Sequence, residues 1–197
     1  FTNVEWKQYR REVQAVFQDP YAAFNVLFPA DRVLFTPLRK YNIASSDDEA
    51  RELVSKALES VGLRAEEILG KYPYQLSGGQ RQRILLARSF LLRPRLIIAD
   101  EPVSMLDASL RAELLNLMLD FKNRLGVSFL YITHDLSTAS YISDYIAVMY
   151  RGDLVEVGSV NDVLEEPLHP YTKLLMESIP IPDPTKRWES SVELTPR

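Results

Sequence analysis

Leu96-Ile97-Ile98-Ala99-Asp100-Glu101 is a run of four apolar residues that ends in two adjacent carboxylates. A continuous apolar run of this length is typical of a parallel strand that is buried on both faces. A helical pattern follows from Asp107 to Leu125, and Val127 to Ile132 is a second apolar strand. Strand, helix and strand in this order form a βαβ unit, whose right-handed crossover makes the two strands parallel. The sequence therefore predicts an α/β fold.

The two predicted strands both end in polar residues, Asp100-Glu101 on the first and Thr133-His134-Asp135 on the second. Ligands of open α/β sheets bind outside the carboxyl ends of the strands. One carboxylate can hold Mg²⁺, and the other can orient or deprotonate an attacking water. His134 can donate to a phosphoryl oxygen. The alternative is that these are solvated strand ends followed by helix caps.

Leu76-Ser77-Gly78-Gly79-Gln80 begins a helix that we expect to run to about Leu92. Ser77 and Gln80 have the spacing of a capping box, which is a purely structural interpretation. A cap does not need two glycines in the first turn, where each costs up to about 1 kcal/mol relative to alanine. Without side chains, the backbone N–H groups at the positive end of the helix are open to an anion. The glycines therefore favour a phosphate site.

The remaining segments predict a helical insert within the α/β core. We expect a strand at Val13–Gln18, a short helix near Ala30–Leu38, and a helix from Ser45 that ends at Gly62. Two strands, Tyr145–Tyr150 and Leu154–Val157, joined by a tight turn at Gly152-Asp153, precede two short helices. The predicted division is a core strand at 1–20, a helical subdomain at 21–92, an α/β core at 93–160 and a C-terminal extension at 161–197.

Composition excludes several classes of protein. The 197 residues carry a formal net charge of −4, which gives no reason to expect nucleic acid as a partner. The chain has no cysteine, so it has neither disulfides nor thiolate metal ligands. No apolar run approaches the roughly 20 residues of a membrane helix. Because the chain starts at Phe1, we interpret it as a fragment or a processed product.

An ordered set of motifs resembles the ABC ATPases. Residues 76–80 reproduce the LSGGQ signature of that family letter for letter, and residues 96–101 resemble its Walker B strand with the catalytic glutamate. Gln18 resembles the Q-loop residue, Ser104-Met105-Leu106-Asp107 the D-loop, and His134 the switch histidine. Residues 169–173, HPYTK, resemble the extension of the oligopeptide and dipeptide importer subfamily.

The resemblance implies a role for each matching residue. Asp100 would help to hold Mg²⁺, Glu101 would polarise the attacking water, and His134 would contact the γ-phosphate of ATP. Gln18 would sense the metal and the water and couple the helical subdomain to a membrane subunit. The signature residues Ser77, Gly78, Gly79 and Gln80 would bind the γ-phosphate of a nucleotide held by a second subunit. Asp107 would lie at the seam between the two subunits, and it is equally suited to cap the following helix.

The family's phosphate-binding loop, G-x-x-x-x-G-K-S/T, is absent from the chain. In the family it lies upstream of the Q-loop, so the resemblance implies an incomplete P-loop NTPase-like core that cannot hydrolyse ATP alone. The complete protein would be a peripheral subunit at the cytoplasmic face of the cell membrane. There it would power import of a solute, with peptides expected, through a permease, as a homo- or heterodimer of ATPases. The alternatives are a soluble ABC ATPase of translation or DNA repair, and a non-catalytic docking module.

Residues 21–46 are rich in apolar side chains but have little regular pattern. An exposed apolar patch often marks a binding site, and the resemblance implies that a short helix of the permease docks here. The alternative is that these side chains fill the subdomain's own core. The residues concerned are Tyr21, Phe24, Val26, Leu27, Phe28, Leu34 and Phe35.

Overall fold

The computed structural model describes residues 2–178 of the chain. It divides into two compact units, one ending at His134 and the other beginning at Asp135. This division falls inside the range 93–160, which the sequence analysis treats as one domain.

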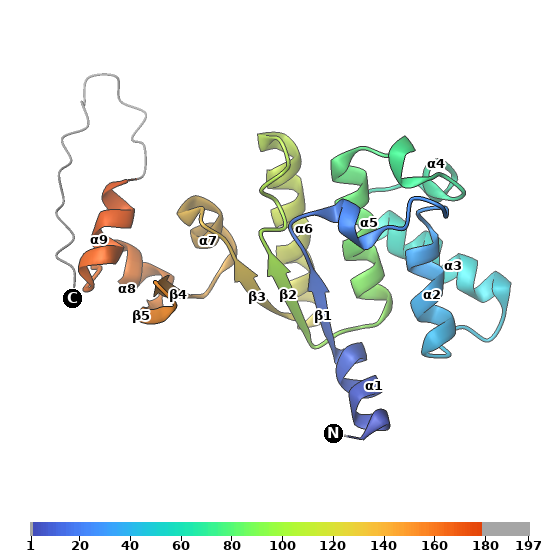
Figure 1. The fold of residues 1–197 in the computed structure, drawn as a ribbon, viewed down its shortest axis with the longest axis horizontal. Coiled ribbons are helices and arrows are strands. Elements are labelled where there is room, and N and C mark those ends of the chain that lie inside the picture. The colour runs from blue at the N-terminus through green and yellow to red at the C-terminus, as the bar shows by residue number, and fades with distance from the viewer. Residues whose placement is uncertain (1, 179–197) are drawn as a thin grey trace. The chain divides into compact units, whose positions relative to one another are not determined.

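The first unit contains a three-stranded parallel sheet (Figure 1). Its strands are β1 (Val13–Val16), β2 (Leu96–Asp100) and β3 (Ser128–Ile132), in the order β1-β2-β3. Helix α6 (Ala108–Leu125) connects β2 to β3. The predicted βαβ unit and its parallel strands are therefore confirmed, and β2 is the central strand of the three.

The helical insert between β1 and β2 is built around α5 (Gly78–Leu91), which packs against α2, α3, the 3₁₀ helix η1 and β1. Apolar side chains such as Ile84 and Leu86 of α5 are fully buried in this packing. Phe90 of α5 also stacks on Phe121 of α6. The other elements of the insert are η1 (Pro20–Ala23), α2 (Arg32–Lys40), α3 (Asp47–Ser60), α4 (Ala65–Ile68) and η2 (Pro73–Gln75).

Helix α1 (Asn3–Glu12) precedes β1 and was not predicted. Thr2 and Glu5 form a capping box at its start, but none of its residues is buried. A helix without a buried apolar face lacks the periodicity by which helices are found in a sequence. The helix ends where the chain enters β1, and together they carry several residues that line a pocket beside α2 and α5.

The second unit contains an antiparallel hairpin of β4 (Tyr145–Tyr150) and β5 (Asp153–Ser159). The turn consists of Arg151 and Gly152, both with positive φ, and lies one residue before the predicted Gly152-Asp153, because Asp153 already belongs to β5. The hairpin packs with α8 around a small apolar core that includes Ile146 and Val163. The unit also contains α7 (Leu136–Ile142), α8 (Val160–Glu165) and α9 (Pro170–Glu177). The predicted extension at 161–197 continues beyond the described residues.

None of the helices within residues 2–178 combines the length and the hydropathy that a membrane span requires.

Candidate nucleotide site

The carboxylate of Glu101 is held between side chains that follow the other two strands of the sheet. Nε2 of Gln18 donates to Oε2 of Glu101 at 2.8 Å, and Nδ1 of His134 lies 2.8 Å from Oε1. Gln18 lies two residues beyond β1, Glu101 directly follows β2, and His134 lies two residues beyond β3. The register pairs Asp100 with Ile132, so the expected shared edge of the two strand ends is confirmed. Each of the three parallel strands is thus followed by one polar side chain, and these three side chains form one cluster.

The backbone at Glu101 turns sharply as it leaves the strand. Its φ is +44°, in the left-handed region that non-glycine residues rarely adopt. The Glu101 N–H donates to the carbonyl of Ile132 at 2.9 Å, and its carbonyl accepts from the N–H and the hydroxyl of Ser104. Backbone conformations of this kind persist where the surroundings fix them, and they concentrate at active sites. The turn therefore positions the Glu101 carboxylate independently of its two side-chain partners.

Burial differs between the members of this cluster. The Glu101 side chain is 23% exposed, whereas that of His134 is 75% exposed. Asp100, the last residue of β2, is half-buried beside them. Across the described part of the chain, no group of three or more His, Cys, Asp or Glu side chains could hold a metal ion. Mg²⁺ commonly uses only one or two carboxylates together with substrate phosphates and water. A single carboxylate such as Asp100 fits that mode of binding.

The signature segment forms the start of α5, with the predicted capping box. The Ser77 hydroxyl accepts from the Gln80 N–H at 3.2 Å, and Oε1 of Gln80 accepts from the Ser77 N–H at 3.0 Å. The N–H groups of Gly78 and Gly79 donate to no other residue in the described structure. These two groups remain available to an anion at the positive end of the helix.

The two signature glycines have different reasons to lack a side chain. A Cβ added to Gly78 would meet nothing within 4 Å, whereas one added to Gly79 would lie 3.1 Å from Cδ1 of Leu110. Gly79 therefore lets α5 approach α6 closely, which is a packing role that the sequence analysis did not consider. Only Gly78 leaves open space of the kind an approaching phosphate needs.

The signature helix and the Q-loop line one small pocket. It has a volume of about 200 Å³, and both Gln18 and Gly78 lie in its wall. The residues that follow the signature segment connect the two sides of this pocket, the start of α5 and the Q-loop. The Arg81 guanidinium donates to the carbonyls of Pro73 and Leu76 and lies 3.4 Å from the centre of the Tyr21 ring. The side-chain amide of the next residue, Gln82, donates to the Phe17 carbonyl at 3.4 Å.

Arg81 and Gln82 were missed by the sequence analysis. Polar residues in a helix are normally assigned to its solvated face, yet both side chains are buried here. The available signal was their position directly after the signature segment. Through them, the start of α5 is tied to the chain on either side of Gln18.

Asp107 is the N-cap of α6. Its Oδ1 accepts from the Leu110 N–H at 3.0 Å and from the Ser109 hydroxyl at 2.9 Å. The bond from the Leu110 N–H, with that from Ser109, lowers the pKa of the Asp107 carboxyl below its usual range. The predicted capping role is confirmed.

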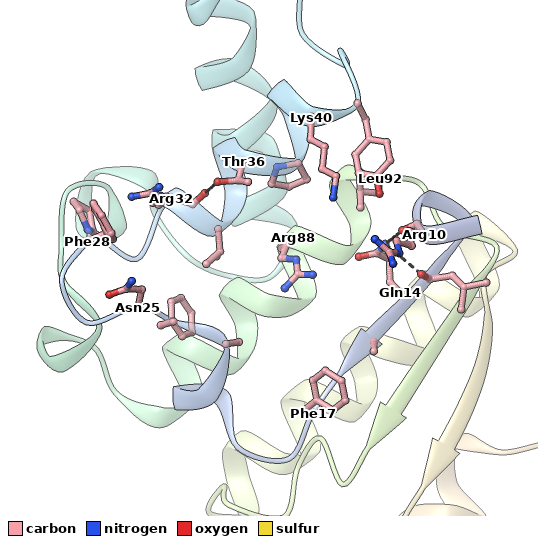
Figure 2. A pocket seen from close by; sticks show the side chains of 18 residues that line it. Arg10, Gln14, Phe17, Asn25, Phe28, Arg32, Thr36, Lys40, Arg88 and Leu92 are labelled. Atoms are coloured by element: carbon pink, nitrogen blue, oxygen red, sulfur yellow. Dashed lines mark hydrogen bonds between the residues drawn. The ribbon is translucent and has the colours of Figure 1, made fainter. Parts of the chain in front are cut away.

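A second pocket, of about 470 Å³, lies between β1, the loop after η1, α2 and α5 (Figure 2). Phe28 and Phe24 both line it, the former exposed and the latter buried. The apolar cluster of residues 21–46 thus divides between the subdomain's core and its surface. Phe24 and Leu34 are buried, and Tyr21, Val26, Leu27 and Phe28 are exposed.

Comparisons with known proteins identify the same family as the motifs. The sequence model of the family described as ABC transporter matches residues 1–104, and that described as Oligopeptide/dipeptide transporter, C-terminal region, matches residues 155–196. The oligopeptide transport ATP-binding protein OppF of Escherichia coli is 42% identical over 190 residues, which are 96% of this chain and 57% of OppF. The corresponding protein AmiF of Streptococcus pneumoniae is 44% identical over 174 residues, 88% of this chain and 56% of AmiF. The chain thus spans little more than half the length of these relatives.

A solved structure shares the fold. The dimeric post-hydrolysis state of the ATP-binding cassette MJ0796, bound to ADP and Pi, superimposes with a TM-score of 0.71 and 27% sequence identity. The match covers 81% of this chain and 68% of that cassette. The α/β fold with a helical signature subdomain is therefore that of an ABC ATPase. With the family model matching more than half of its residues, the chain belongs to the ABC transporter family.

Proposed function

We propose that this chain is the greater part of an ATP-hydrolysing subunit that powers the import of peptides through a membrane permease. The observation that carries the proposal is the cluster of Gln18, Glu101 and His134 at the carboxyl ends of three parallel strands. A degenerate docking module would have no reason to keep a strained backbone and two side-chain contacts at one carboxylate. A soluble ABC ATPase is not favoured, because the relatives are oligopeptide transport proteins.

Glu101 acts on water in the proposed reaction. Its carboxylate accepts a proton from the attacking water, or orients that water toward the γ-phosphate of ATP. His134 donates to the charge that develops on the transferred phosphoryl group. The Gln18 amide, which is bonded to the same carboxylate, connects the state of the reaction to the helical subdomain. In this geometry one carboxylate oxygen of Glu101 contacts Gln18 and the other contacts His134. One of these two contacts breaks when the attacking water binds to Glu101.

Asp100 is the residue we propose as the protein's ligand for Mg²⁺, with Gln18 as a second oxygen donor. A metal ion held there would neutralise negative charge on the phosphates. Asp100 is suited to this because, unlike Glu101, it is not engaged with His134.

The signature segment is proposed to act on a nucleotide held by a second ABC ATPase subunit. The free N–H groups of Gly78 and Gly79, the Ser77 hydroxyl and the Gln80 amide would surround the γ-phosphate. Asp107 would then lie at the seam between subunits. Both homodimers and heterodimers satisfy this arrangement.

The phosphate-binding loop is proposed to come from a part of the complete protein outside these 197 residues. Among the residues that the structure describes, strand β3 pairs with β2 alone, and its Leu130 and Ile132 side chains are 52% and 45% exposed. An open edge with exposed apolar side chains is a site at which a sheet gains further strands. The longer relatives have room for such strands.

The docking site for the permease is proposed to be the larger pocket, beside β1 and α2. This pocket borders the part of the chain that follows Gln18. A segment of the permease bound there can therefore shift the equilibrium between two states of the helical subdomain. This would hold the protein at the cytoplasmic face of the cell membrane as a peripheral subunit.

Reconstitution of the complete protein with its permease in proteoliposomes tests the proposal. We expect uptake of labelled oligopeptides that requires ATP and ceases when the ATPase subunit is omitted. Peptide uptake without ATP would contradict the proposal, as would normal uptake in the absence of this subunit. ATPase activity that never couples to any permease would instead support a soluble ABC ATPase.

A further inference from the structure

Gln82 of α5 is a buried glutamine with one polar atom paired and the other unpaired. The residue is 2% exposed, and its side-chain amide donates to the Phe17 carbonyl at 3.4 Å. Among the described residues, its Oε1 atom is buried and has no hydrogen-bond partner. A buried acceptor without a partner is unfavourable, and a methionine would fill a similar volume without that cost. Packing alone therefore does not explain a glutamine at this position.

The Phe17 carbonyl lies just beyond the part of β1 that the sheet holds. The pairing of β1 with β2 ends at Val16 and Ala99, and Phe17 is the next residue of the chain. Backbone carbonyls at such a position need a partner from outside the ladder. The Gln82 amide is a partner of this kind, and it restrains the backbone one residue beyond the end of the strand.

The bond from Gln82 fixes the backbone from which the Gln18 side chain starts. The Phe17 carbonyl and the Gln18 N–H belong to the same planar peptide unit, so a bond to one restrains the orientation of both. The Gln18 side chain donates through Nε2 to Oε2 of Glu101 at 2.8 Å. Gln18 itself is exposed, so close packing does not hold its side chain in place. Its direction therefore depends on the backbone that Gln82 restrains.

The preceding residue of α5, Arg81, contacts the chain on the other side of Gln18. Arg81 is 4% exposed, and its guanidinium lies 3.4 Å from the centre of the Tyr21 ring, three residues beyond Gln18. Gln18, Arg81 and Gln82 all line the pocket of about 200 Å³. Two consecutive buried polar residues thus contact the segment before and after Gln18, and Gln82 makes the contact that is nearer in the chain.

We propose that Gln82 is a positioning residue for ATP hydrolysis and acts through Gln18. By holding the peptide unit between Phe17 and Gln18, it keeps the Gln18 amide within reach of the Glu101 carboxylate. This rests on the proposed function, in which Glu101 acts on the attacking water, and adds a residue that lies outside the signature segment. Because Glu101 serves the chemical step, the contribution of Gln82 falls on kcat and not on the KM for ATP.

A double-mutant cycle in the complete protein tests whether Gln82 acts through Gln18. Gln82→Met keeps the length of the side chain and removes the amide, and Gln18→Ala removes the side chain that is to be positioned. We expect Gln82→Met to lower kcat about tenfold, with a KM for ATP within about twofold of the parental value. In the Gln18→Ala protein the same change should lower kcat no further, because no side chain is left to position. An equal loss of kcat in both backgrounds would overturn the proposal.

Two further variants guard against effects on folding. Gln82→Asn keeps an amide but is one methylene too short to reach the Phe17 carbonyl, so it repeats the cycle with a polar group in place and carries the test if Gln82→Met does not fold. Ser89→Ala is the matched control, because Ser89 is 1% exposed on the same helix and its hydroxyl donates to the Leu85 carbonyl. Ser89→Ala should keep the parental kcat even if it lowers the melting temperature. A loss of kcat equal to that of Gln82→Met would indicate general loosening of α5 and would refute the positioning role.

The inference and the proposed function fail in different ways. If Gln18→Ala lowers kcat, but Gln82→Met lowers it by the same factor with or without Gln18, only the positioning role is wrong. If Gln18→Ala leaves kcat at the parental value, the role of Gln18 in the proposed function is wrong, and with it this inference.

Discussion

Gly79 lies so close to Leu110 that a single added carbon would come within 3.1 Å of its Cδ1 atom. A carbon added to the neighbouring Gly78 would meet no atom within 4 Å. The signature segment is therefore constrained at Gly79 by the packing of α5 on α6, and at Gly78 by whatever binds there. The glycine at position 79 therefore serves the stability of the fold, and the glycine at position 78 serves ligand binding.

Alanine substitutions in the complete protein test that separation. Gly78→Ala should raise the free energy of unfolding by about 0.4–1 kcal/mol, because it reduces the freedom of the unfolded chain and meets no atom in the folded one. Gly79→Ala should stabilise the protein less than Gly78→Ala does, or should destabilise it, because the Leu110 side chain must move to make room for the added methyl group. Both variants should lower ATPase activity. Urea denaturation of the two proteins gives the comparison, and a more stable Gly79→Ala would contradict the packing role.

The Glu156 carboxylate ties the start of α9 to strand β5 in the second unit. It accepts from the Leu168 N–H at 2.8 Å and from the His169 N–H at 3.0 Å. The bond from Leu168 is the largest cause that holds the pKa of Glu156 below its usual range. A carboxyl whose pKa is lowered on folding stabilises the folded state above its ordinary pKa of about 4.3, and this contribution is lost as the pH falls through the lower value.

Hydrogen exchange tests this contact. Protection of the Leu168 and His169 amides should be complete at neutral pH and should decline only below about pH 4.3. Glu156→Gln should reduce that protection at neutral pH and flatten its dependence on pH, whereas Asp153→Asn, at an exposed carboxylate of the same strand, should leave both unchanged. Protection that is identical in the Glu156→Gln protein would show that the carboxylate does not hold the segment.

The 197-residue chain by itself should bind MgATP weakly. It provides the signature N–H groups and the Asp100 carboxylate, but no phosphate-binding loop. Calorimetric titration should detect no micromolar site in these 197 residues, whereas the complete protein should have one. Micromolar affinity in the 197-residue chain would contradict the interpretation that the nucleotide cradle lies elsewhere.

Mixed dimers of the complete protein test whether the signature acts on the partner's nucleotide. Ser77→Arg should abolish the anion site at the start of α5, and a subunit with this change is paired with a Glu101→Gln subunit. If the signature acts across the seam, the altered signature faces the altered glutamate, and the other site keeps a full set of residues. The mixed dimer should then hydrolyse ATP, while each homodimer is inactive. An inactive mixed dimer would indicate that both residues serve the same polypeptide's site.

The sequence predicts the core of this fold well because its main elements carry strong local signals. The apolar run that ends at Asp100 and the helical stripe of residues 107–125 define the βαβ unit, and the ordered motifs then identify the family. Helix α1 lacks a buried face, so no periodicity marks it. The division at His134 depends on which strands pair, and pairing between distant residues leaves no local pattern.

The candidate site shows the same limit. Glu101 and His134 could be expected near one another because parallel strands end at a common edge, and the structure places them in contact. The packing role of Gly79 could not be anticipated, because it depends on where Leu110 of another helix lies.

The rate of ATP hydrolysis by the Glu101→Gln variant of the complete protein tests the central assignment most directly. The amide cannot accept a proton from water, so turnover should fall by about 10²–10⁴-fold. ATP binding should be retained, and an ATP-bound dimer should accumulate on size-exclusion chromatography. Glu66→Gln, at an exposed carboxylate of α4, serves as the matched control and should keep the parental rate. Parental turnover in the Glu101→Gln protein would contradict the role assigned to Glu101.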